Sequence, residues 1–403
     1  MITVSEAQAL IERTNIQFSA RDMSLEKALG KYLATPIRAD RDFPPYDRVT
    51  MDGIALAFKD WEGGSRSFRV TGQQLAGAVP IAYGGQGSCI EIMTGAVLPE
   101  GTDTIIRFED LDIRGQEGEQ YAHITVPELS KGQNVHRQGT DRKAGSELVP
   151  QGVLLSAAEI AVAATVGNTQ VNVIEPPSIA ILSSGDELVN VEDTPQPHQI
   201  RRSNSYMLRA ALQDLGVYAP MVHLPDNPRL IQDQLAILLK ENQVLVLTGG
   251  VSKGKADHIP SVLASLGVKK EFHRIKQRPG KPFWFGAHEQ ENCVVFALPG
   301  NPVSSFISFY RYIYPWLQGK MAGKVPVQTY ARLASSFSFA PDLTYFLLVD
   351  AQVNEAGTYQ AHPIPGSGSG DLANLLRCNA FLELPSERSV FDRGEVFPMW
   401  RYR

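Results

Sequence analysis

The chain has 403 residues, of which 38 are lysine or arginine and 43 are aspartate or glutamate, for a formal net charge of −5. This balance gives no support for nucleic-acid binding or for attachment to an anionic membrane, so any anion site must be local. The three cysteines lie far apart and form no CxxC pair, which argues against a disulfide framework and a zinc site. No apolar run reaches the roughly 18 residues that span a bilayer, and the first residues do not resemble a signal peptide. We expect a soluble, cytoplasmic protein.

The N-terminal part predicts helices followed by a β domain. Ser5 and Gln8 have the spacing of a capping box, and a second apolar stripe of helical period begins near Ser24. Residues 39–140 then change character, because glycine, proline and short apolar runs alternate there. Within this β region, the turn at Asp52 and the turn-rich loop at Thr94 look unlike ordinary strands, although an Asp-Gly pair alone is usually just a turn.

The helical pattern returns after Asp141. Ser156 and Glu159 have capping-box spacing, and a helix is predicted over 157–165, with Gly167 suited to the position after its end. If this helix rejoins the N-terminal pair, the β region between them is an insertion.

From residue 177 onward, apolar strand patterns alternate with helical patterns. Buried strands are predicted at SIAILSS and VLVLT, and helices over about 204–215, 259–266 and 302–317. This alternation is typical of a doubly wound α/β domain. From about residue 323 the chain returns to short β runs, which predict a separate C-terminal β domain.

The loop after the second of those strands, TGGVSKGKAD, is the strongest candidate for a binding site. Glycines let the backbone adopt conformations closed to other residues and expose N–H groups to an anion. Ligands of open α/β sheets lie beyond the carboxyl ends of the strands, so we interpret this loop as a phosphate or oxyanion site. The alternative is a plain tight turn. The spacing of a Walker loop is absent.

Six segments in series resemble the molybdopterin molybdenumtransferase family, which includes MoeA and the E domain of gephyrin. They are PPYDRVTMDGIA, IMTGAVLPEGTDTII, AILSSGDELV, TGGVS, RPGKPFWFG and ALPGNPVSSF. The resemblance implies a multidomain α/β plus β fold: a helical domain (1–38 and 141–176), an inserted β domain (39–140), a doubly wound α/β molybdopterin-binding domain (177–322) and a C-terminal β domain (323–403).

The resemblance also implies a reaction. Molybdate would be inserted into adenylylated molybdopterin, giving molybdenum cofactor and AMP, with Mg²⁺ assisting. The family works as a homodimer whose cleft lies between the α/β domain of one subunit and the inserted domain of the other. The upstream adenylyltransferase is a candidate partner.

Matching motifs carry over a set of site residues. The catalytic candidates are Asp52, Glu187, Asp257 and Lys281, with Glu187 and Asp257 as metal ligands, because Mg²⁺ prefers oxygen ligands and often takes one or two protein carboxylates. The substrate-binding candidates are Thr94, Asp141, Asp226, Gly249, Gly250, Ser252, Arg274, Arg278, Pro299 and Pro302. The glycine turns, Gly280 and Gly300 among them, would offer N–H donors to phosphate. The prolines could instead merely shape turns, and Asp226 could merely precede a helix cap.

The chain departs from the family pattern at several positions. Arg274 and Arg278 stand where the family has lysines, and arginine differs from lysine in reach and hydration. Lys255 replaces the usual acid of the TGGVS loop and Lys253 adds a second positive charge, which should favour an anion over Mg²⁺. Two other functions stay open: a scaffold of the gephyrin E-domain type, and an enzyme like the molybdopterin adenylyltransferase.

Overall fold

The computed structural model describes residues 1–116, 118–251, 258–366 and 368–403. The chain divides into two compact units. The first comprises residues 1–35, 151–156 and 171–403, and the second comprises residues 36–150 and 157–170. The four domain boundaries implied by the resemblance stay a prediction. None of the described helices is both long and apolar enough to cross a membrane.

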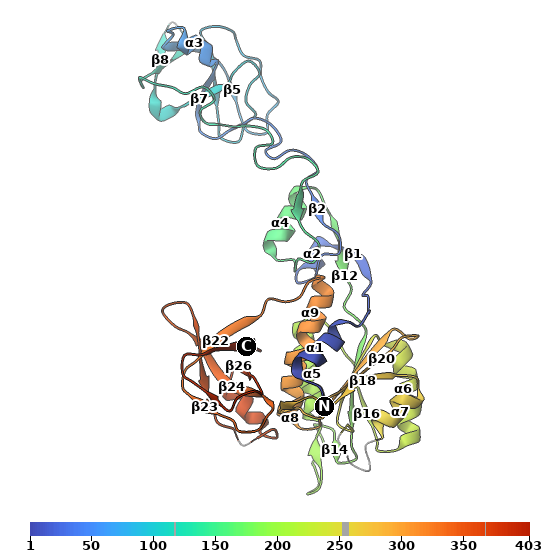
Figure 1. The fold of residues 1–403 in the computed structure, drawn as a ribbon. Helices are drawn as coiled ribbons and strands as arrows, with labels where there is room; N and C mark the ends of the chain where they lie inside the picture. Colours follow the sequence, from blue (N-terminus) through green and yellow to red (C-terminus); the bar gives the residue numbers. More distant parts are fainter. Residues whose placement is uncertain (117, 252–257, 367) are drawn as a thin grey trace. The chain divides into compact units, whose positions relative to one another are not determined.

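A six-stranded sheet forms the centre of the first unit (Figure 1). Its order is β16 (Met221–Leu224), β13 (Ile179–Ser184), β17 (Val244–Thr248), β21 (Cys293–Leu298), β20 (Trp284–His288) and β18 (Lys269–His273). The first four strands are parallel, β20 is antiparallel to β21, and β18 is antiparallel to β20. The predicted doubly wound α/β domain is therefore confirmed.

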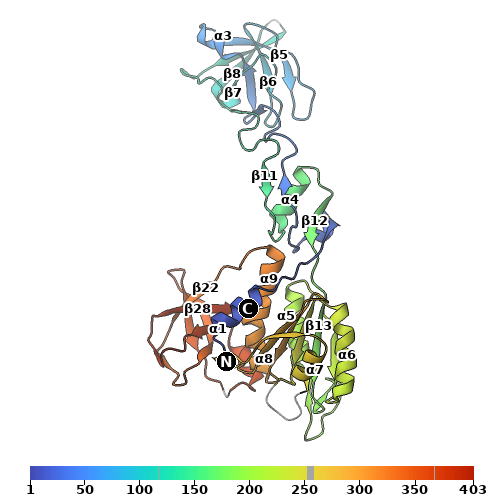
Figure 2. The same ribbon diagram turned by 45° about the vertical axis from the view of Figure 1, so that its right-hand side comes forward.

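Helices cover both faces of this sheet because successive strand side chains point to opposite sides. In β17, Val244 and Val246 pack with α1 (Val4–Glu12) and α5 (Ser203–Asp214), whereas Leu245 and Leu247 pack with α6 (Pro228–Glu241) and α7 (Ile259–Ser265). Figures 1 and 2 show these two sets of helices on opposite sides of the sheet. A parallel strand covered on both faces must be apolar at every position, as the sequence of β17 is.

Two predictions near the N-terminus were wrong in detail. The first helix is capped by Thr3, whose Oγ1 accepts the N–H of Glu6 at 3.2 Å, while Glu6 Oε2 accepts the N–H of Thr3 at 2.7 Å. Ser5 and Gln8 lie inside the helix, because a cap must precede the first helical residue. The second predicted helix is only α2 (Leu25–Ala28), since the chain turns at Gly30 (φ +71°) and Leu33 pairs with Val173.

The helix predicted over 302–317 occurs as three consecutive segments. These are α8 (Pro302–Ser308), a π-helical turn η2 (Phe309–Ile313) and α9 (Tyr314–Ala322). A π turn adds a residue to the helix and rotates the side chains that follow it. Here it occurs where Arg311 and Tyr312 are both buried.

The C-terminal strands of the first unit close into a small barrel. Pairing runs from β24 (Thr344–Val353) through β25 (Tyr359–Pro363), β22 (Thr329–Leu333), β28 (Val396–Arg401) and β26 (Ala380–Leu384) back to β24. Short strand β19 (Gln277–Arg278) joins β24 in parallel and so ties the α/β part to the barrel. Closure leaves the barrel few open strand edges.

The second unit contains a different six-stranded sheet and helix α4 (Ala157–Thr165), which has the predicted span. The sheet order is β7 (Thr104–Arg107), β4 (Gly53–Leu56), β6 (Ser88–Ile92), β5 (Ser67–Gln74), β9 (Glu119–Ile124) and β8 (Leu111–Gln116). Strand β4 is buried throughout, with Ile54 and Leu56 in one core cluster and Ala55 in another. Its position fixes the turn at Asp52 that precedes it.

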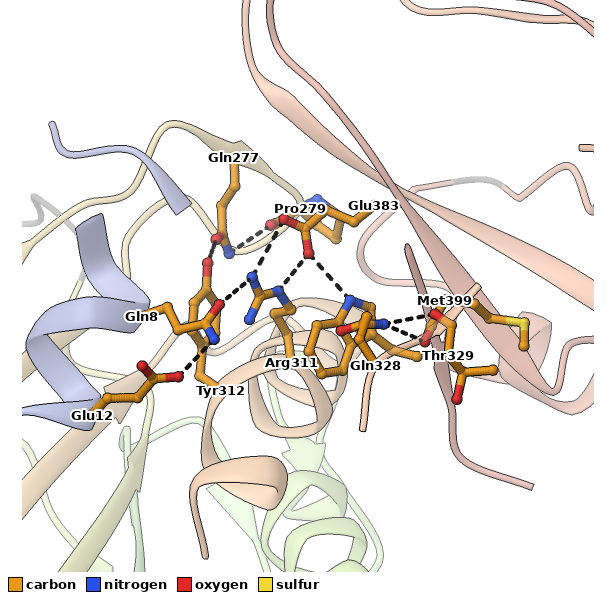
Figure 3. A network of polar contacts seen from close by, with 11 residues as sticks. Gln8, Glu12, Gln277, Pro279, Arg311, Tyr312, Gln328, Thr329, Glu383 and Met399 are labelled. Atoms are coloured by element: carbon orange, nitrogen blue, oxygen red, sulfur yellow. Dashed lines mark hydrogen bonds and ion pairs between the residues drawn. The ribbon is translucent and has the colours of Figure 1, made fainter. Parts of the chain in front are cut away.

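A buried ion pair joins the helical segment to the barrel (Figure 3). Arg311 on η2 donates to Glu383 on β26 from Nε (2.6 Å) and Nη2 (3.3 Å), and its side chain is only 5% exposed. Trp400 Nε1 also donates to Glu383 at 3.2 Å, and the Arg311 guanidinium lies 4.4 Å from the centre of the Trp400 ring. The charge of Arg311 is therefore fully compensated inside the interface.

Replacing Glu383 with glutamine should destabilise the first unit, because the guanidinium of Arg311 would stay buried without its counter-charge. Breaking a buried pair in this way costs about 3 kcal/mol. Thermal unfolding of wild type and Glu383→Gln measures the loss. Glu395→Gln weakens a partly exposed ion pair with Arg388, in which the Glu395 side chain is 31% exposed, and serves as the control, with little expected change. Equal midpoints for Glu383→Gln and wild type would contradict the prediction.

Candidate functional site

A cavity of about 380 Å³ opens where the loops after β13, β16, β17 and β21 meet. These strands are parallel, so their carboxyl ends share one edge of the sheet. The cavity brings together Glu187, Asp226, Gly249, Gly250 and Pro299 from the predicted set. It also includes residues that were not predicted, among them Ser184 and Asn301.

Three residues that line this cavity have backbone N–H groups without a partner among the described residues. Those of Gly250, Gly300 and Asn301 donate to no acceptor in the described part of the chain. Gly249 has a different role, since its N–H donates to Leu298 O at 3.1 Å; a Cβ there would lie 2.7 Å from Ser184 O. Unpaired N–H groups in a concave loop are ready donors for an anion.

Two carboxylates, those of Glu187 and Asp226, also line this cavity. Asp226 accepts from Ser184 Oγ at 3.0 Å and exchanges hydrogen bonds with Asp186, through Asp226 N to Asp186 Oδ1 (3.0 Å) and Asp186 N to Asp226 Oδ2 (3.4 Å). Glu187 folds back over Gly185, where a Cβ would come within 2.4 Å of Glu187 Oε2. Among the described lining residues there is no lysine or arginine.

Asn204 on α5 links two of the strand-end loops. Its Nδ2 donates to Thr248 Oγ1 at 2.8 Å and to Gly300 O at 2.7 Å. The buried Oδ1 of Asn204 has no partner among the described residues. No sequence signal distinguished Asn204 from other polar residues that begin a helix, so the prediction missed it.

A second cavity of about 540 Å³ contains the predicted cations Arg278 and Lys281. It lies between the α/β part and the barrel and shares Pro282 and Asn301 with the first cavity. Asn374, only 5% exposed, contributes to its lining and has an Nδ2 without a hydrogen-bond partner in the described chain. The lining includes no carboxylate among the described residues. The described linings of the two cavities therefore differ in charge: that of the first is acidic and that of the second is basic.

The remaining candidates of the first unit lie elsewhere. Arg274 has a left-handed backbone (φ +81°) and lines neither cavity, and Pro302 is the first residue of α8. The predicted residues Ser252 and Asp257 lie outside the described residues, as do Lys253 and Lys255.

The second unit holds the other predicted residues. Asp52 Oδ1 accepts from the backbone N–H of Thr94 at 2.6 Å and from its hydroxyl at 2.8 Å. These bonds, the backbone one first, hold the pKa of Asp52 below its ordinary value. Gly53 follows because no Cβ fits there: it would lie 1.8 Å from Ile106 O. Asp141 pairs with His136 Nε2 at 2.9 Å.

The substitution Thr94→Val should raise the pKa of Asp52 toward its ordinary value, since one of its two donors is lost. The remaining N–H should keep the pKa below that value, so the carboxylate would protonate at a higher pH than in wild type. Carbon-detected NMR titration of the Asp52 carboxyl group measures this shift. Thr50→Val, which removes a hydroxyl bonded to Asn134 O, is the control. An unchanged Asp52 titration in Thr94→Val would refute the assignment.

Comparison with known proteins covers the whole chain. Residues 2–167 match the MoeA N-terminal region, residues 180–319 a probable molybdopterin-binding domain, and residues 330–402 the MoeA C-terminal region. A molybdopterin molybdenumtransferase of Synechocystis is 36% identical over 403 residues, all of both chains. One of Nostoc is 32% identical, covering 96% of this chain and 89% of its own.

A solved structure gives the same result. The molybdopterin biosynthesis MoeA protein of Pyrococcus horikoshii superposes with a TM-score of 0.84 at 28% identity, covering 100% of this chain and 99% of its own. The resemblance inferred from the six motifs and the expected fold class are thereby confirmed. The chain belongs to the molybdopterin molybdenumtransferase (MoeA) family.

Proposed function

We propose that this protein inserts molybdate into adenylylated molybdopterin, giving molybdenum cofactor and AMP. The observation that carries the proposal is the pair of adjoining cavities with opposite charge. Both substrates are anions, and adenylylated molybdopterin also contains a phosphoanhydride bond that must be broken. A site for them needs donors for phosphate oxygens, cations beside the anions, and carboxylates that can hold a metal ion or water.

The donors and cations of the two cavities match these needs. The free N–H groups of Gly250, Gly300 and Asn301 can hold a phosphate group. Arg278 and Lys281 supply positive charge in the neighbouring cavity. At about 4 Å and an effective dielectric constant near 20, one such charge pair is worth about 4 kcal/mol before desolvation. Because Asn301 borders both cavities, one ligand can reach both sets of groups.

The reaction balances without an oxidant. Two S–Mo bonds form and one Mo–O bond breaks, and the protons of the two thiol groups leave with that oxygen as one water molecule. A water molecule cleaves the phosphoanhydride bond, its oxygen bonding to phosphorus, and AMP departs. Molybdenum remains Mo(VI). We propose that Glu187 and Asp226 orient the attacking water, since they are the carboxylates that line the first cavity.

The described residues also fit Mg²⁺. They contain no cluster of three or more histidine, cysteine, aspartate or glutamate side chains that could enclose a metal ion. Mg²⁺ needs no such cluster, because it takes one or two protein carboxylates and completes its shell with water and phosphate oxygens. We propose that Glu187 and Asp226 hold the ion, together with Asp257 outside the described residues. Bound there, Mg²⁺ would neutralise charge on the phosphoanhydride.

The role that we propose for the hydrogen-bonded pair Asp52–Thr94 depends on dimerisation. We propose that the protein is a homodimer and that Asp52 and Thr94 of one subunit complete the cleft of the other. The bonded pair ties two turns together and presents a carboxylate on an exposed turn. A scaffold protein would need no such group. An adenylyltransferase would consume ATP and form adenylylated molybdopterin, so assaying both reactions separates the alternatives.

The first test measures AMP release in a single turnover with adenylylated molybdopterin and molybdate. Glu187→Gln and Asp226→Asn should each slow release by about 100-fold, since losing one preorganised electrostatic group typically costs 10²–10³ in rate. Asp233→Asn, on the exposed face of α6, is the matched control and should leave the rate unchanged. Near-normal release in either site variant would remove that residue from the mechanism.

The second test examines the shared cleft. Asp52→Ala and Glu187→Ala homodimers should both be inactive, and sedimentation should give about twice the 44.2 kDa chain mass. A purified mixed dimer has one cleft with both residues intact, so it should regain about half of wild-type activity. If the cleft lies within one subunit, each chain carries one defect and the mixed dimer stays inactive. A monomer would also contradict the proposal.

A further inference from the structure

The cationic residues Arg278 and Lys281 lie on a short loop that closes on itself. Arg274 N donates to Phe283 O at 2.8 Å, and Ile275 N donates to Lys281 O at 3.0 Å. Arg278 and Lys281 are both exposed and line the 540 Å³ cavity. The conformation of this loop therefore decides whether two positive charges face the cavity.

One side chain fills the inside of the loop. Gln277 is fully buried, and its Nε2 donates to Pro279 O at 3.2 Å and to Gly280 O at 3.3 Å. Gly280 leaves no spare room, because a Cβ there would lie 2.7 Å from Gln277 Nε2 (φ +86°). Both carbonyls are held inward by one amide, which leaves the neighbouring side chains to point outward.

A single hydroxyl group fixes that amide. Tyr312 Oη donates to Gln277 Oε1 at 2.5 Å, and Figure 3 shows this bond continuing through Gln277 to Pro279. If the amide of Gln277 were reversed, its oxygen would lie against the carbonyl oxygens of Pro279 and Gly280. These partners therefore determine the orientation of the amide. Burial raises the pKa of Tyr312, which keeps the hydroxyl a donor. The ring packs on Phe283, at 5.3 Å between centroids, just past the loop.

The same helical turn also anchors the barrel. Arg311, one residue before Tyr312, binds Glu383 of β26 and donates to Gln8 Oε1 of α1 at 2.9 Å (Figure 3). Tyr312 is thus held in place from the barrel side as well as from the core. The π turn lets both consecutive side chains be buried against different neighbours.

We propose that Gln277 and Tyr312 are positioning residues that hold Arg278 and Lys281 toward the cavity and thereby set the affinity for the anionic substrate. This inference rests on the proposed function only for the identity of that substrate. Both side chains are buried, so they would act through the loop rather than by direct contact with the ligand. Their effect is expected in substrate affinity, with little change in the rate constant of a saturated enzyme.

The variant Tyr312→Phe removes one hydroxyl and leaves Gln277 Oε1 as a buried acceptor without a donor. We expect about tenfold faster hydrogen exchange at the backbone amides of Arg274 and Ile275, since the loss of one buried partner is worth about one power of ten. The Kd for adenylylated molybdopterin should rise by about five- to tenfold, with kcat within about twofold of wild type. Tyr314→Phe is the control, because its hydroxyl donates to Asp214 instead, at 2.9 Å.

Two further variants separate positioning from general damage. Gln277→Met also removes the donor of Pro279 O and Gly280 O, so it should loosen the loop and raise Kd at least as much as Tyr312→Phe, and adding Tyr312→Phe to Gln277→Met should raise Kd no further. In the Arg278→Ala, Lys281→Ala background, Tyr312→Phe should not raise Kd further, because the groups it positions are gone. Additive effects there would overturn the inference.

The outcomes distinguish this inference from the proposed function. Unchanged hydrogen exchange in Tyr312→Phe overturns the positioning role whatever the substrate is. Faster exchange with unchanged Kd shows that the loop does not serve binding and also overturns it. If wild type fails to bind adenylylated molybdopterin, the proposed function fails, and hydrogen exchange alone then decides the structural part of the inference.

Discussion

Burial of the parallel strands on both faces is the constraint on which the site depends. Strands β13, β17 and β21 lie under helices on either side, so a polar side chain along their length would lack water and partners. Polar chemistry is therefore confined to the strand ends. Ser184 and Thr248 are the last residues of β13 and β17, and glycines follow both. The cavity is lined by residues from this edge of the sheet.

The barrel completes the site by ordering its basic half. Strand β19, which carries Arg278, pairs with β24 of the barrel, and Asn301 Nδ2 donates to Ser369 Oγ at 3.0 Å. The buried Arg311–Glu383 pair fixes the same interface from the other side. The basic residues of one cavity and the acidic residues of the neighbouring cavity are thus held by different segments of the chain. This separation matters because opposite charges in direct contact would neutralise each other and leave less charge for a ligand.

The sequence was most informative where one physical rule dominates. Continuous apolar runs predicted β13 and β17, and the glycine loop after β17 does border a cavity. The motif resemblance predicted the family and the fold class. Predictions that required a choice between similar residues were wrong. Thr3, rather than Ser5, caps the first helix. The second predicted helix is short because Leu33 pairs with a distant residue of the chain instead of continuing the helix.

Residues that act through partners distant in sequence could not be found from one chain. Asn204 meets Gly300, and Gln277 meets Tyr312, only after folding. Glu187 and Asp226 were predicted from motifs, and the structure places both in one cavity, but their roles remain proposals. Arg274 was expected to bind substrate, yet its left-handed backbone lies where strand β18 ends, and it lines neither cavity.

We propose that the strand-end cavity holds the phosphate groups of the substrate, and a crystal structure of the protein with adenylylated molybdopterin would show where they bind. We expect phosphate oxygens within hydrogen-bonding distance of the backbone N–H groups of Gly250, Gly300 and Asn301, with Glu187 and Asp226 beside the phosphoanhydride. Phosphate bound away from these three N–H groups, with the cavity holding only water, would contradict it.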